Sequence, residues 1–133
     1  MESPYFKLLV LKASAPEVTR KFYQALGFEF IGEKHGNGPF HFSGALGAGV
    51  LEIYPVADGS VANSDLHLGF TVQNLQRILD ALRLIETPIR SAPKETKWGL
   101  RAVVEDPDGR VVEIYQEPGG PPQHPDSSPP SLS

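Results

Sequence analysis

The chain has 133 residues, a formal net charge of −4 and no cysteine. This is the length of one ordinary domain, and an acidic balance without a Lys/Arg cluster argues against nucleic acid and membrane surfaces as partners. The lack of cysteine excludes disulfides, thiolate metal sites and cysteine nucleophiles, so any metal must be bound by His, Asp or Glu.

The first half of the chain predicts a strand, a helix and then three more strands. The helix is expected to begin at a capping box formed by Ser14 and Glu17 and to end at Gly27. Its predicted buried stripe consists of Val18, Phe22 and Leu26. The strands are expected at residues 6–13, 28–32, 40–44 and 49–56.

The second half of the chain repeats this order. Asn74 is the expected N-cap of its helix, and Pro88 lies past the helix end. The residues expected on the buried face of this helix are Leu75, Ile78, Leu79 and Leu82. The strands are expected at residues 66–72, 87–91, 99–105 and 110–116, with a "DPDG" turn from Asp106 between the last two.

The near-constant spacing between the halves indicates an internal duplication. Leu8 aligns with His67 at an offset of 59 residues, and Glu52 aligns with Glu113 at an offset of 61. We therefore expect one domain over residues 1–116. Within it, module one spans about residues 5–56 and module two about residues 64–116.

The last segment, residues 117–133, holds six of the thirteen prolines and is predicted to be a disordered tail. His124 lies in this tail and is expected to be solvated. The N-terminus lacks the pattern of a secretory leader, and no apolar run reaches the length of a membrane-spanning helix. We therefore expect a cytoplasmic protein.

Two similar strands, "VLEIY" and "VVEIY", each carry a central glutamate. Strand alternation turns Glu52 and Glu113 away from the face that packs on the helices, and it puts His67 on the same open face. A single glutamate in such a strand is ordinarily a surface residue. Two carboxylates and one imidazole together could instead hold a divalent ion such as Mn, Mg, Ni, Fe or Zn.

Several segments carry a resemblance to a known superfamily. They are "FYQALGF" from Phe22, "HLGFTV" from His67, "KWGLRAVVEDPDGRVVEIYQ" from Lys97 and the paired "VLEIY" and "VVEIY". The pattern resembles the vicinal oxygen chelate superfamily, which includes glyoxalase I, bleomycin resistance proteins and extradiol dioxygenases. The resemblance implies an α+β fold. In it, two βαβββ modules form a curved, half-barrel-like mixed sheet, a cup with the helices on its outer face.

The resemblance also implies positions for a metal site. The four ligand positions of glyoxalase I-like members fall on Leu8, Glu52, His67 and Glu113, and Leu8 offers no ligand atom. The other three could suffice for a catalytic metal. By the same resemblance, Glu52 or Glu113 is the candidate general base. One imidazole with two carboxylates is not the donor set of iron dioxygenases, so extradiol ring cleavage is disfavoured.

The candidate substrate pocket adds residues whose roles stay open. His41 is either pocket lining or surface, Arg101 either binds an anionic substrate or is solvated, and Trp98 either lies at the pocket mouth or packs. The predicted pocket residues are Leu8, Lys12, His41, Trp98 and Arg101. His35 is expected to face solvent from a Gly-rich loop.

Two functions compete. The first is a glyoxalase-like isomerase or lyase that uses a divalent metal to chelate vicinal oxygens of a small substrate and to stabilise an enolate. The second is a metal-free small-molecule binding protein of the bleomycin-resistance type. Leu8 favours the binding protein, whereas the retained Glu52, His67 and Glu113 favour the enzyme, towards which we lean. A homodimer is expected in either case.

Overall fold

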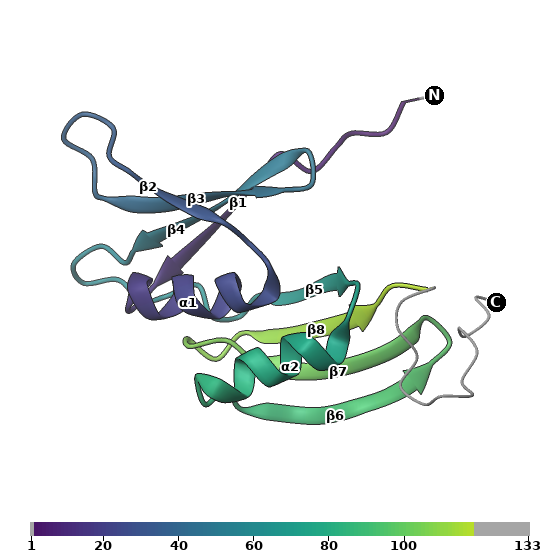
Figure 1. The fold of residues 1–133 in the computed structure, drawn as a ribbon. Helices are drawn as coiled ribbons and strands as arrows, with labels where there is room; N and C mark the ends of the chain where they lie inside the picture. The colour runs from purple at the N-terminus through teal and green to yellow at the C-terminus, as the bar shows by residue number, and fades with distance from the viewer. Residues whose placement is uncertain (1, 119–133) are drawn as a thin grey trace. The chain divides into compact units, whose positions relative to one another are not determined.

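The computed structural model describes residues 2–118. The chain divides into two compact units with the boundary between Ser64 and Asp65. Each unit has one helix on one face of a four-stranded mixed sheet, which gives the predicted α+β class (Figure 1). The predicted disordered tail and His124 lie outside the described residues, apart from Glu117 and Pro118.

The first unit has the sheet order β1-β4-β3-β2. Strand β1 is parallel to β4, and the other two pairs are antiparallel. Helix α1 supplies the crossover between β1 and the hairpins and contacts β1, β3 and β4. The elements are β1 (Leu8–Ala13), α1 (Pro16–Leu26), β2 (Phe30–Glu33), β3 (His41–Leu46) and β4 (Gly49–Pro55).

The second unit repeats this topology with the order β5-β8-β7-β6. Strand β5 is parallel to β8, and helix α2 contacts β7 and β8 (Figure 1). The elements are β5 (His67–Val72), α2 (Leu75–Leu84), β6 (Ile89–Thr96), β7 (Gly99–Glu105) and β8 (Val111–Gln116).

The strand register is the same in both units. Leu8 pairs with Val50 in the first sheet, as His67 pairs with Val111 in the second. These pairs keep the offsets of 59 and 61 residues found in the sequence. The two glutamates therefore occupy equivalent places, Glu52 opposite Val10 and Glu113 opposite Gly69.

Each sheet has one apolar face and one polar face, as strand alternation predicts. Leu51, Ile53, Val112 and Ile114 are fully buried on the helix-covered faces. Glu52 and Glu113 lie between these residues in sequence and point to the opposite, open faces, where they are half-buried. Apolar side chains thus form a core under each helix and leave the polar residues on the other side.

Helix α1 differs from its prediction in two details. It begins at Pro16 with Ala15 as the N-cap residue, one residue later than expected from Ser14. Val18 is 52% exposed, so its predicted burial is wrong. The buried residues are Thr19, Phe22, Tyr23 and Leu26, a stripe with the spacing of one helical face, from which Val18 is rotated away.

Helix α2 follows its prediction closely. Asn74 is the N-cap residue, and its Oδ1 accepts a hydrogen bond from the Arg77 backbone N–H at 3.1 Å. Leu75, Leu79 and Leu82 are fully buried. The predicted apolar face is therefore the one that packs on the sheet.

Strand β6 is longer than predicted and continues through Pro93 to Thr96. It lies at the edge of its sheet, where a residue without a backbone N–H is tolerated. Its register against β7 shifts twice, between Ile89 and Ser91 and between Ser91 and Lys94. These irregularities explain why the periodicity did not reveal the full strand.

The turn between β7 and β8 contains a buried ion pair that the sequence did not reveal. Arg110 is 0% exposed, and its guanidinium Nη1 lies 2.8 Å from Asp106 Oδ2. Asp106 Oδ1 also accepts hydrogen bonds from the backbone N–H groups of Asp108 and Arg110. The side chain of Asp106 therefore joins the turn backbone to a buried cation.

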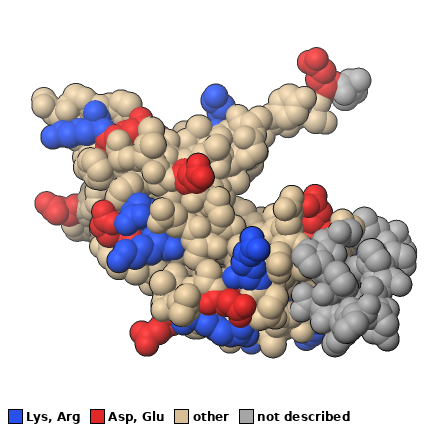
Figure 2. All heavy atoms as spheres, in the orientation of Figure 1, with Lys and Arg blue, Asp and Glu red and all other residues tan. Residues whose placement is uncertain are grey.

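Charged side chains of both signs lie on the surface that Figure 2 shows. On the face shown in Figure 2, basic and acidic side chains are interspersed, without a large patch of one sign. Within residues 2–118, no helix is both long and apolar enough to cross a membrane.

Replacing Asp106 should destabilise the second unit strongly. We expect Asp106→Ala to lower the free energy of unfolding by about 3–5 kcal/mol, because it leaves the buried guanidinium of Arg110 without its main partner. Asp80→Ala is the matched control, since Asp80 pairs with Arg83 on the surface of α2 and should cost less than about 1 kcal/mol. Urea denaturation measures the free energy of unfolding of both variants. Equal decreases in the two variants would contradict a stabilising role for the buried Asp106–Arg110 pair.

Candidate functional site

The open face of the second unit centres on Glu113. His67 Nε2 lies 2.6 Å from one carboxylate oxygen, Oε2. The Tyr115 hydroxyl donates to the other, Oε1, at 2.5 Å, and Arg101 Nη1 lies 3.4 Å from the same oxygen. Arg101 is therefore paired with a carboxylate of its own unit.

Strand pairing brings these groups together. Glu113 stands opposite Gly69 of β5 and Val103 of β7. His67 and Arg101 are each two residues from those partners, so their side chains share the face of Glu113. At Gly69 a side chain would meet only open space, and the glycine leaves the face clear beside the carboxylate.

The network holds Glu113 as an anion. The hydrogen bond from Tyr115 lowers the pKa of Glu113 most, the hydrogen bond from His67 and the charge of Arg101 lower it further, and burial opposes them. The same hydrogen bond and burial raise the pKa of Tyr115. A carboxylate with three partners and a lowered pKa is a weak proton acceptor.

The first unit has a different arrangement around Glu52. His41 takes the place that Arg101 has in the second unit, because Ser43 pairs with Glu52 as Val103 pairs with Glu113. The His41 ring stacks on the Tyr54 ring at a centroid distance of 4.1 Å, and its Nε2 lies 3.7 Å from Glu52 Oε2. His41 is 1% exposed, so the alternative that it is a surface residue is wrong.

Leu8 and Lys12 lie on this same open face. Leu8 occupies the position of His67 in the other unit, is 52% exposed and offers no ligand atom. Lys12 Nζ lies 4.8 Å from the Tyr54 ring centroid, a cation–π distance. The Lys12 backbone N–H donates to Asn63 Oδ1 at 2.7 Å.

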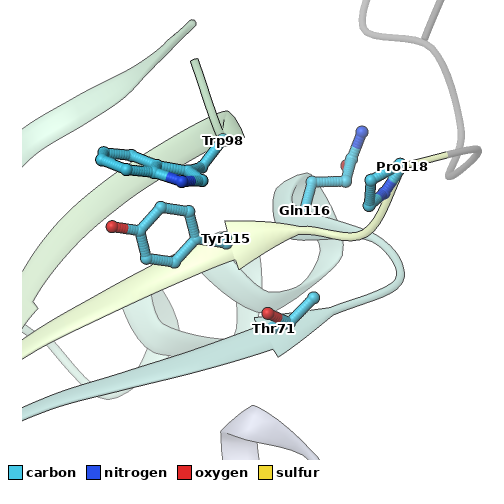
Figure 3. A pocket seen from close by; sticks show the side chains of 5 residues that line it. All are labelled: Thr71, Trp98, Tyr115, Gln116 and Pro118. Atoms are coloured by element: carbon cyan, nitrogen blue, oxygen red, sulfur yellow. The ribbon is translucent and has the colours of Figure 1, made fainter. Parts of the chain in front are cut away.

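A cavity of about 490 Å³ opens at the carboxyl ends of β5 and β8 in the second unit (Figure 3). Trp98, at the turn between β6 and β7, forms one wall of it and is 60% exposed. The turn is held by Thr96 Oγ1, which accepts from the Trp98 N–H and donates to the Gly99 carbonyl oxygen. The lining residues are Thr71, Trp98, Tyr115, Gln116 and Pro118.

Four of the lining residues were not predicted from the sequence, namely Thr71, Tyr115, Gln116 and Pro118. Strand alternation places Thr71 and Tyr115 on the open face, so the sequence pattern could have indicated these two residues. Gln116 and Pro118 lie where β8 ends, and their role depends on the path of the chain after the strand. Figure 3 shows the Trp98 and Tyr115 side chains among those that line the cavity.

The sequence matches the Glyoxalase/Bleomycin resistance protein/Dioxygenase superfamily over residues 8–114. The chain belongs to this superfamily. A comparison with curated proteins gave no significant match.

Solved structures with the superfamily's fold resemble this chain at low identity. TnmS3, described as an antibiotic binding protein from Streptomyces sp. CB03234, is 22% identical, with a TM-score of 0.69 and coverage of 87% of this chain and 98% of its own. A glyoxalase/bleomycin resistance protein from the same source is 22% identical, with a TM-score of 0.65 and coverage of 83% and 98%. Oxidase ChaP-H2 is 16% identical, with a TM-score of 0.69 and coverage of 88% and 96%. These likenesses concern the fold.

The metal position of the superfamily fits this chain only in part. One of the four ligand positions is occupied by Leu8, which has no ligand atom. His67 and Glu113, at two of the others, are in contact within the second unit. Glu52 belongs to the first unit, so the complete set of three ligands stays a prediction. Within residues 2–118, one group of three donors that could hold a metal ion was found, and it consists of Glu33, His35 and His41.

Removing the Tyr115 hydroxyl should raise the pKa of Glu113. Tyr115→Phe deletes the hydrogen bond that lowers this pKa most. NMR titration of the Glu113 carboxyl carbon measures the change, and Tyr54→Phe in the other unit is the matched control. An unchanged pKa of Glu113 in Tyr115→Phe would contradict the hydrogen bond from the Tyr115 hydroxyl to Glu113.

The same variant should lose stability in a pH-dependent way. A lowered carboxyl pKa stabilises the fold above the ordinary value of 4.5, and this stabilisation fades as the pH falls through the folded-state value. Tyr115→Phe should therefore cost about 1 kcal/mol near pH 7 and less as Glu113 protonates.

Proposed function

We propose that this chain is a small-molecule binding protein whose ligand site is the cavity beside Trp98 and Tyr115. The observation that carries the proposal is an exposed tryptophan on the wall of a cavity of about 490 Å³. This volume lies within the range of roughly 300–1,000 Å³ typical of small-molecule sites. An aromatic ring exposed there gains contact area when a ligand covers it.

The chemistry of the lining favours a planar, partly apolar ligand with a few polar groups. The indole of Trp98 and the ring of Tyr115 provide flat surfaces for stacking. Thr71 carries a hydroxyl that can orient a polar substituent. Lys97 Nζ lies 4.4 Å from the Trp98 ring centroid and adds a positive charge beside the cavity.

The state of Glu113 supports binding over proton transfer. Its carboxylate is engaged by His67, Tyr115 and Arg101, and its pKa is lowered. A general base works best with a pKa near the operating pH. The likeness in fold to an antibiotic binding protein adds support for ligand binding.

A second candidate is a metal-dependent isomerase or lyase, which the 2.6 Å contact between His67 and Glu113 favours. Both side chains could instead bind one divalent ion, with Glu52 of this chain or of a second copy in a homodimer as a third ligand. A bound ion would polarise vicinal oxygens of a small substrate. Glu52 or Glu113 would then be the ligand that leaves the ion and acts as the base.

Trp98 is the single tryptophan of the chain, so its fluorescence reports on the cavity directly. We expect anthraquinone-2-sulfonate, a planar anionic probe, to quench this fluorescence in a saturable way. Calorimetry should show about 10-fold weaker binding in Trp98→Ala, from the loss of stacking. Tyr5→Ala, an exposed aromatic position outside the cavity, is the control, and equal affinity in Trp98→Ala would overturn the proposal.

The enzyme candidate makes a different prediction. Protein loaded with Mn, Ni, Zn or Mg should turn over a thiohemiacetal substrate, and Glu113→Gln should abolish turnover because it removes a charged ligand. Metal-dependent isomerisation measured by absorbance tests this. Absence of turnover with every metal would count against the enzyme and leave the binding proposal standing.

A further inference from the structure

The β2–β3 hairpin of the first unit gathers two imidazoles and a carboxylate, apart from the cavity of the second unit. Glu33 ends β2 and pairs directly with His41, which begins β3. His35 lies in the loop between these strands. The ligand atoms of the three residues all lie within 4.8 Å of one another.

The His41 ring is fixed in place by its surroundings. Its Nδ1 lies 3.2 Å from the Pro39 carbonyl oxygen, and its face stacks on Tyr54 with an interplanar angle of 8°. A carbonyl oxygen only accepts hydrogen bonds, so Nδ1 is assigned as the donor, and in the neutral ring Nε2 then carries the lone pair. This is the arrangement that orients histidine ligands in metal sites, where the second nitrogen donates to a carbonyl.

The Nε2 atom of His41 has no hydrogen-bond partner although the residue is 1% exposed. The nearest carboxylate oxygen of Glu52 lies 3.7 Å away, beyond hydrogen-bonding distance. A buried acceptor without a partner is unfavourable, and such an atom in a native structure calls for an explanation. A cation bound at Nε2 provides one.

The other two donors are also suitably placed. His35 Nε2 lies 3.2 Å from Glu33 Oε2, and the His35 and His41 ring centroids are 5.3 Å apart. Glu52 Oε2 lies 3.7 Å from His41 Nε2, so the two carboxylates of Glu33 and Glu52 lie beside the two imidazoles. An ion between the imidazoles would thus meet a negative field.

We propose that Glu33, His35 and His41 form a binding site for a divalent transition metal ion, with zinc as the matching probe. Two imidazoles and one carboxylate suit Zn, Fe or Ni, whereas Mg and Ca prefer oxygen ligands. Three protein ligands leave an open coordination position. The ion would also link β2, β3 and the loop between them, so it should stabilise the hairpin.

The test is calorimetric titration of the tag-free, chelator-treated full chain with ZnCl₂. His35→Ala and Glu33→Gln remove ligands from exposed or half-buried positions, so neither should prevent folding. Each should weaken zinc binding by at least ~100-fold, more than the loss of a supporting hydrogen-bond partner costs. Glu95→Gln, an exposed carboxylate on the edge strand β6 of the other unit, is the matched comparison for Glu33→Gln and should leave this affinity unchanged.

Thermal unfolding gives an independent readout. Zinc should raise the melting temperature of the unsubstituted protein and of Glu95→Gln, but not that of His35→Ala. The proposal would be overturned if His35→Ala bound zinc as tightly as the unsubstituted protein. It would also be overturned if zinc affinity fell only in Glu95→Gln. Fluorescence titration of Trp98 is a separate measurement, so failure of the zinc site leaves the ligand proposal unaffected.

Discussion

One helix can cover only one face of a four-stranded sheet, and this constraint organises both units. Strand alternation sends Leu51, Ile53, Val112 and Ile114 under the helices, and it sends every second residue to the open face. A polar side chain on that face keeps contact with water, so it can be charged without the cost of full burial. The faces that the helices leave open therefore carry titratable side chains of the strands, among them Glu52, His67 and Glu113.

The repeated register gives both units the same set of positions, and a few substitutions make them chemically different. The second unit has His67 and Arg101 on either side of its glutamate, and both contact the carboxylate of Glu113. The first unit has Leu8 and His41 at the same places, so an imidazole buried against Tyr54 takes the place of the arginine. The first unit is thus suited to hold a cation, and the second holds its own charges balanced beside a cavity.

The features that follow from local period and spacing could be predicted from the sequence. The βαβββ order, the faces of the glutamates and the shared face of His67 and Glu113 depend only on alternation and on a constant offset. The buried Arg110 could not be predicted, because its burial depends on how the turn backbone folds around Asp106. The cluster at Glu33, His35 and His41 was missed for a similar reason, since it requires the hairpin register and the path of its loop.

Tyr115 connects the two functional features of the second unit, because it lines the cavity and donates to Glu113. A ligand that accepted a hydrogen bond from the Tyr115 hydroxyl would take this donor away from Glu113. Glu113 would then lose the hydrogen bond that lowers its pKa most. The pKa of Glu113 would then rise in the complex, and the complex would bind a proton more readily than the free protein. By linkage, such a ligand would bind more tightly as the pH falls towards that pKa. A ligand that only stacks on Trp98 would leave the carboxylate network intact and bind without this pH dependence, so the pH dependence of affinity distinguishes the two poses within one cavity.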